Sequence, residues 1–121
     1  MKLVTHVNKH THVLNWIRLW NGGFNLTEKE QAFFGAILEK YLTLIEDGVK
    51  EPYIGELVFS TKNMNEIKDS LNLTKQGLTN YKVALKDKGV IRKNDAGVWT
   101  VLPMLVPKTE VTFSFVYDEQ R

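Results

Sequence analysis

The spacing of hydrophobic residues between positions 61 and 91 predicts two helices joined by a tight turn. In the first helix, Met64, Ile67 and Leu71 recur at steps of three and four residues, which places them on one helical face. Asn72 follows them, and asparagine tolerates the left-handed backbone conformation that a sharp turn requires. Thr74 then supplies a side-chain oxygen that can cap the second helix.

The second helix has an apolar side and a free side. Leu78, Tyr81 and Leu85 fall on one face, and Gly89 stands where a glycine commonly ends a helix. We expect the apolar side to pack against the first helix, as in a helix-turn-helix motif. The opposite side carries Lys75, Gln76, Thr79, Asn80, Lys82, Val83 and Lys86.

A longer helix is predicted from Thr27 to about Asp47, ending at Gly48. Thr27 and Glu30 form the three-residue spacing of a capping box, in which each side chain accepts a hydrogen bond from the other residue's backbone N–H. The helix has a wide apolar face and is therefore predicted to be the central core helix. That face consists of Phe33, Phe34, Ile37, Leu38, Tyr41, Leu42 and Ile45.

Near the beginning of the chain, the pattern predicts a short strand over residues 2–7 and a helix over residues 10–20. Val13, Trp16, Ile17 and Trp20 form the apolar stripe of this helix. Two tryptophans in so short a helix indicate docking, either against the rest of the chain or against a second copy.

The remaining segments alternate in ways that favour β-structure. Residues 51–60 predict a loop and a short strand, and residues 90–93 and 98–102 predict a hairpin around a glycine-bearing turn. Residues 110–117 predict a further strand, whose apolar side must pair with residues 2–7, with the hairpin or with another chain. That apolar side contains Val111, Phe113, Phe115 and Tyr117.

Positive charge is concentrated around the second helix of the pair. Residues 74–93 contain six basic residues and one acidic residue, a net charge of +5, whereas the whole chain carries +2 and the remainder therefore carries −3. On the free side of that helix, Gln76 and Asn80 can each make paired hydrogen bonds to adenine in a major groove. The candidate DNA-binding residues are Thr74, Lys75, Gln76, Thr79, Asn80, Lys82, Lys86, Arg92 and Lys93.

The run EIKDSLNLTKQGLTNYKVALKDKGVI, residues 66–91, resembles the winged helix-turn-helix of MarR-type regulators and of plasmid and phage replication initiators. The resemblance implies a mainly α, α+β fold with DNA-binding function. It divides the chain into an N-terminal strand and helix arm (1–24), a winged helix-turn-helix domain (25–102) and a C-terminal β-strand extension (103–121). The sequence departs from the family pattern at Lys68, usually a small residue, at Asn72, usually glycine, and at Lys82, usually apolar. We expect Lys82 either to extend its charged end to solvent or to leave its packing role to Val83.

Composition limits the other possibilities. The chain of 121 residues is 43% hydrophobic and 25% charged, as is typical of a soluble domain, and it has no apolar run long enough to span a membrane and no signal-peptide core. It has no cysteine, and His6, His10 and His12 have no nearby ligands to complete a zinc site. No catalytic motif is present, so we expect a non-enzyme without metal or cofactor.

The sequence therefore favours a cytoplasmic regulator of transcription or replication, of phage or mobile-element type, that binds duplex DNA as a homodimer. The alternative is a phage structural or packaging protein that uses the winged helix for protein interactions. In that case the working surfaces are Trp16 and Trp20 together with Val111, Phe113 and Phe115.

Overall fold

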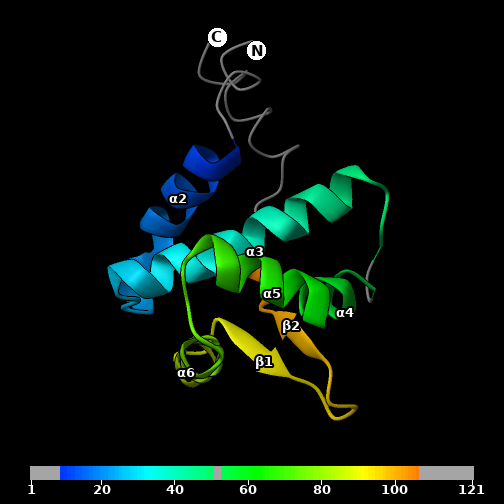
Figure 1. Ribbon diagram of the computed structural model, residues 1–121. Helices are drawn as coiled ribbons and strands as arrows, with labels where there is room; N and C mark the ends of the chain where they lie inside the picture. The colour runs from blue at the N-terminus through cyan, green and yellow to red at the C-terminus, as the bar shows by residue number, and fades with distance from the viewer. Residues whose placement is uncertain (1–8, 51–52, 107–121) are drawn as a thin grey trace, which may run out of the picture.

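The computed structural model describes residues 9–50 and 53–106, so the strands predicted at residues 2–7 and 110–117 lie outside the described residues. The described chain is mainly helical and has a two-stranded antiparallel hairpin after its last long helix (Figure 1). In chain order the elements are α2 (Lys9–Trp20), η1 (Asn21–Gly23), α3 (Glu28–Glu46), α4 (Tyr53–Val58), α5 (Thr61–Ser70), α6 (Lys75–Asp87), β1 (Ile91–Lys93), β2 (Trp99–Val101) and η2 (Pro103–Leu105).

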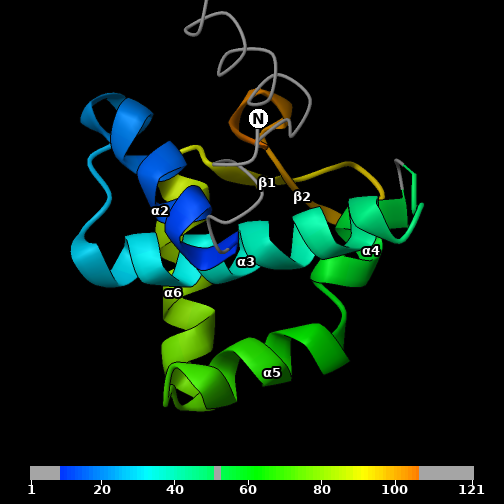
Figure 2. The same ribbon diagram turned by 90° about the horizontal axis from the view of Figure 1, so that it is seen from above.

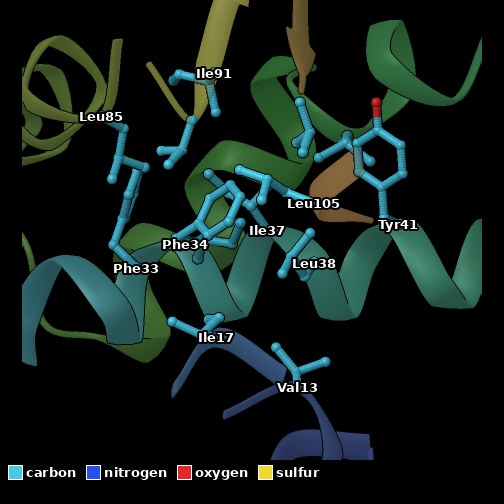
Figure 3. Packing of buried hydrophobic residues seen from close by; sticks show 14 of the residues in the cluster. Val13, Ile17, Phe33, Phe34, Ile37, Leu38, Tyr41, Leu85, Ile91 and Leu105 are labelled. Atoms are coloured by element: carbon cyan, nitrogen blue, oxygen red, sulfur yellow. The ribbon is translucent and has the colours of Figure 1, made fainter. Parts of the chain in front are cut away.

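Helix α3 is the central helix of the core, as predicted. It lies between α2 on one side and α6, the hairpin and η2 on the other (Figure 3). Of its predicted apolar face only Ile45 is substantially exposed, at 41%, because it lies in the last turn. The buried members are Phe33, Phe34, Ile37, Leu38, Tyr41 and Leu42. Burying each such side chain contributes about 1.5–3 kcal/mol, so this face is the main source of packing energy.

The capping box at the start of α3 is confirmed. Glu30 N donates to Thr27 Oγ1 at 3.2 Å, and Thr27 N donates to Glu30 Oε1 at 2.9 Å. The Glu30 carboxylate also accepts a hydrogen bond from Lys88 Nζ at 2.5 Å, and the same ammonium donates to the Asn25 carbonyl oxygen at 2.9 Å. The side chain of Glu30 therefore links the beginning of α3 to the end of α6.

Helix α2 docks within its own chain. Val13 and Ile17 are fully buried, and Trp16 Nε1 donates to the Leu105 carbonyl oxygen at 2.7 Å. The Trp20 ring lies edge-on to Phe34, with 5.8 Å between ring centroids. Both tryptophans are half-buried, so the structure places them against the fold, which is one of the two alternatives that the sequence left open.

The strand predicted within residues 51–60 is wrong, because residues 53–58 form helix α4. Ile54 and Val58, four residues apart, are buried on one face of this helix. Gly55 is also buried there, and a Cβ added at Gly55 would lie 3.0 Å from the Trp99 carbonyl oxygen. Glycine therefore lets α4 pack directly on the backbone of β2, a tertiary contact that overrides the strand preference of this apolar run.

Helices α5 and α6 are joined by a tight turn and cross steeply (Figure 2). Asn72 has a φ of 55°, in the left-handed region, as predicted. Its N–H donates to the Asp69 carbonyl oxygen, and Leu73 N donates to the Lys68 carbonyl oxygen, which is the hydrogen-bond pattern of a Schellman motif. Thr74 Oγ1 then accepts from Gly77 N at 2.9 Å, confirming Thr74 as the cap of α6.

The end of α6 and the predicted hairpin are also present. Gly89 has a φ of 87° and ends α6 with the same Schellman pattern, since Val90 N donates to the Leu85 carbonyl oxygen. Strands β1 and β2 pair in antiparallel register with Lys93 opposite Trp99. In the turn between them, Asn94 Oδ1 accepts hydrogen bonds from Ala96 N and Val98 N.

We predict that Leu85→Ala lowers the free energy of unfolding by about 2–5 kcal/mol, because Leu85 is fully buried and the smaller residue leaves a cavity. Leu19→Ala is the matched control, since Leu19 is 80% exposed and its loss should change stability by no more than about 0.5 kcal/mol. Urea denaturation midpoints measure both. Equal effects of the two substitutions would show that α6 is not anchored through Leu85.

A second prediction concerns Glu30. Burial raises the pKa of its carboxyl, but hydrogen bonds from Lys88 and Thr27 outweigh that effect and lower the pKa below its ordinary value of 4.5. The carboxylate therefore contributes stability above pH 4.5, and this contribution is lost as the pH falls through the folded-state pKa.

Glu30→Gln keeps the capping box but removes the charge, and should cost about 1–3 kcal/mol at pH 7 and reduce the stability lost on acidification. Glu28→Gln is the control, because it removes an exposed carboxylate from the same helical turn. Urea midpoints from pH 7 down to about pH 3 test this prediction. If the urea midpoints of the two variants fall in parallel with pH, the prediction is wrong.

Candidate nucleic-acid interface

Helix α6 has one packed side and one free side. Leu85 is buried on the packed side, and Tyr81 stacks on Phe33 of α3 with 5.6 Å between ring centroids. In Figure 1, α6 is seen nearly end-on at the edge of the fold. The free side is the one that the helical period predicted. Its exposed residues are Lys75, Gln76, Thr79, Asn80, Val83 and Lys86.

The polar side chains at the beginning of α6 bond to one another. Gln76 Nε2 donates to Asn80 Oδ1 at 2.9 Å, and Thr79 Oγ1 donates to the Lys75 carbonyl oxygen at 3.2 Å. Thr74 uses its hydroxyl oxygen for the helix cap. Gln76 and Asn80 thus form a fixed pair at the surface, a relation that sequence analysis did not anticipate although their four-residue spacing allows it.

Three lysines lie along one side of α6. Lys75, Lys82 and Lys86 are spaced by seven and four residues, which returns them to nearly the same angle on the helix. Lys82 Nζ lies 4.8 Å from the centroid of the Trp99 ring. Lys82 therefore faces the hairpin, whereas Lys75 and Lys86 are exposed.

The structure shows whether Lys82 or Val83 packs against the fold. It is half-buried, whereas Val83 is 48% exposed, so Lys82 keeps the packing role and directs its ammonium to the ring of Trp99. Burial lowers the pKa of Lys82, and the nearby charge of Lys93 lowers it further. Both lysines were predicted site residues, whereas Trp99, which the register places directly opposite Lys93, was not.

The hairpin adds two exposed basic residues, Arg92 and Lys93, both on β1. Lys88, which was counted in the net charge of +5 for residues 74–93, is not part of this surface. Its ammonium pairs with Glu30 and bonds to Asn25. The charge available for a ligand is therefore one unit less than the sequence count.

In the part of the chain that the structure describes, no three histidine or acidic side chains are grouped to hold a metal ion. His10 pairs with Glu39 at 2.9 Å, and burial lowers the pKa of His12. Within residues 9–50 and 53–106, no helix is long and apolar enough to cross a membrane.

A shallow hollow of about 720 Å³ lies on another part of the surface and was not predicted. It is formed by α2, α3 and α5, where Ala32 and Ala36, four residues apart on α3, leave space between the helices. Its charged groups already pair with each other, Glu39 with His10 and Lys40 with Glu66. The small residues at helical spacing were the available sequence signal.

No protein-family model, no curated protein and no solved structure matches the chain. The features of this chain that bear on function are chiefly the free side of α6 and the basic residues of the hairpin next to it.

Proposed function

We propose that the protein binds duplex DNA as a winged helix-turn-helix regulator of transcription or replication and acts as a homodimer. In this proposal α6 is the recognition helix and the β1–β2 hairpin is the wing. The observation that carries the proposal is the division of α6 into a side packed on α3 and an exposed, lysine-bearing side. A recognition helix requires this division, because its outer side must enter a major groove.

The arrangement around α6 supports the proposal. The helix follows α5 after a tight turn that contains Asn72 in the left-handed conformation, and the hairpin follows α6 directly after Gly89. One feature differs from the expected pattern: α4 takes the place of the strand before α5, so the described sheet has two strands. The hairpin still follows α6 directly, and its strand β1 carries the basic residues Arg92 and Lys93.

Gln76 and Asn80 are the proposed base contacts. Their mutual hydrogen bond uses Gln76 Nε2 and Asn80 Oδ1, so Gln76 Oε1 can still accept and Asn80 Nδ2 can still donate. Adenine presents a donor, N6, and an acceptor, N7, in the major groove. The pair therefore fits adenine as a unit, and α6 carries no arginine for guanine.

The proposed phosphate contacts are basic side chains around the same face. Lys75, Lys86 and Arg92 are exposed, and none of them pairs with a carboxylate of the described residues. Lysine and arginine at such positions neutralise phosphates and orient the helix on the duplex. The full set of phosphate contacts is Lys75, Lys82, Lys86, Arg92 and Lys93.

The alternative function is protein interaction in a phage particle or packaging complex. It is favoured by Tyr53 and Leu57, which are 62% and 43% exposed and lie four residues apart on α4. Exposed apolar groups on one face are common at protein contacts. Trp16 and Trp20 lend this alternative less support than expected, because both pack within the chain. Val111, Phe113 and Phe115 lie outside the described residues.

Binding to random duplex DNA across a salt series tests the proposed function. Five lysine and arginine side chains that neutralise four or five phosphates predict a log–log slope of the association constant on salt concentration of about −4 to −5. The double variant K75E/K86E should abolish binding, because it replaces two attractive charges with repulsive ones. Fluorescence anisotropy of labelled DNA provides the measurement.

The matched control for this experiment is K29E/K50E, which makes the same change of net charge at exposed lysines outside the interface. It should retain most of the affinity. An equal loss of DNA affinity in the two double variants would show that binding depends on net charge alone. If the wild-type protein does not bind duplex DNA either, the DNA function is rejected. Size-exclusion chromatography with light scattering tests the homodimer.

A further prediction concerns sequence preference. Against the best sequence selected from a random library, Gln76→Ala and Asn80→Ala should each reduce discrimination by about 1–3 kcal/mol. Their effects should not add, because the two side chains act as one hydrogen-bonded pair. Lys86→Gln is the control and should lower the affinity for all DNA sequences by the same factor. If Gln76→Ala instead lowers the affinity for all DNA sequences equally, Gln76 positions the helix and does not read a base.

A further inference from the structure

We propose that Lys82, Lys93 and Trp99 form an anion site that holds one phosphate of the DNA backbone at the junction of α6 and the hairpin. The inference rests on the proposed function for the source of the phosphate. The site itself is a property of the free chain and can be tested without DNA.

Three separate elements bring the site together. Lys82 comes from the middle of α6, Lys93 from the end of β1 and Trp99 from the beginning of β2. Lys82 Nζ and Lys93 Nζ lie 4.8 Å and 5.6 Å from the centroid of the same indole ring. Both ammonium groups therefore lie within cation–π range of one ring, and the charge of Lys93 acts on Lys82.

Packing fixes the position of the ring. Phe59 lies against Trp99 with 6.2 Å between ring centroids, and the β1–β2 register places Lys93 directly across the hairpin. Behind the strand, Gly55 of α4 allows close approach to the Trp99 backbone. The ring is thus a fixed platform for two flexible lysine side chains.

The two positive charges have no acidic partner within residues 9–50 and 53–106. Among the described residues, Lys40, Lys68 and Lys88 each pair with a carboxylate, whereas neither Lys82 nor Lys93 does. The lowered pKa of Lys82, caused by burial and then by Lys93, reflects this uncompensated position. A bound anion would relieve the repulsion between the two ammonium groups and would raise the pKa of Lys82 again.

A phosphate of the duplex fits this site better than an acidic peptide. Lys82 belongs to the same side of α6 as the exposed Lys75 and Lys86, so the anion site continues a line of basic residues. A duplex supplies a regular row of phosphates to such a line. Both ammonium groups already lie near the Trp99 ring. We therefore expect the ring to support the two lysines and not to stack with a base.

The first test titrates inorganic phosphate into the free ¹⁵N-labelled chain at constant ionic strength, with chloride as the replaced anion. The three tryptophan indole N–H resonances of this chain can be assigned sequentially. We expect a saturable shift of the Trp99 resonance only, because Trp16 bonds to Leu105 and the Trp20 nitrogen is buried. The shift should be lost in Lys82→Gln and in Lys93→Gln and kept in Lys86→Gln.

The second test measures duplex binding by the double variant K82Q/K93Q across the salt series. If both lysines hold one phosphate, the slope should fall by about 1, whereas two separate phosphates would lower it by about 2. The K75Q/K86Q variant is the control for separate contacts. The K82Q/K93Q variant should bind at least tenfold more weakly than wild type at low salt.

The outcomes separate the two proposals. No phosphate-dependent shift at Trp99, or a fall of about 2 in the slope, would overturn the anion site while leaving DNA binding intact. If the Trp99 shift shows that an oligoglutamate peptide binds more tightly than phosphate, the assignment to phosphate is wrong. A wild-type chain that binds phosphate at Trp99 but no duplex would overturn the proposed function and the DNA backbone as the source.

Discussion

The contact between α3 and α6 is the interaction on which the rest of the structure depends. Tyr81 stacks on Phe33, Leu85 fills the adjoining core, and Lys88 closes the end of α6 on the capping carboxylate of Glu30. The apolar contacts hold the helix from behind, and the ion pair fixes where it ends. Because these contacts use only one side of α6, the other side is left exposed. The hairpin follows immediately after Gly89, so its position beside α6 is set by the same anchor.

Local sequence signals predicted most of the described fold. The capping box at Thr27 and Glu30, the left-handed Asn72 and the glycine stop at Gly89 each act within a few residues, so their effect can be inferred without the rest of the chain. Helix α4 could not be inferred in this way. Its residues favour a strand locally, whereas the helix packs through Gly55 against the backbone of Trp99, which is 44 residues further along the chain.

In the candidate site too, some features follow from local spacing and others from contacts between distant segments. Helical period alone was sufficient to predict that Lys75, Gln76 and Asn80 share an exposed side. The pairing of Lys88 with Glu30 and the convergence of two lysines on Trp99 join distant segments, so neither could be predicted from spacing. A charge count over residues 74–93 treats all six basic residues as equivalent. The structure separates Lys88, which stabilises the fold, from those available to a ligand.

Lys82 shows how a departure from an expected pattern can be accommodated without loss of the fold. The resemblance drawn from the sequence leads us to expect an apolar residue at this position. Here the half-buried stem of Lys82 occupies that place, while the ring of Trp99 offers the ammonium group an electron-rich face. The compensation requires the hairpin, since Trp99 belongs to β2 and is braced by Phe59. The arrangement therefore places a positive charge between α6 and the hairpin, where a bound polyanion would contact both.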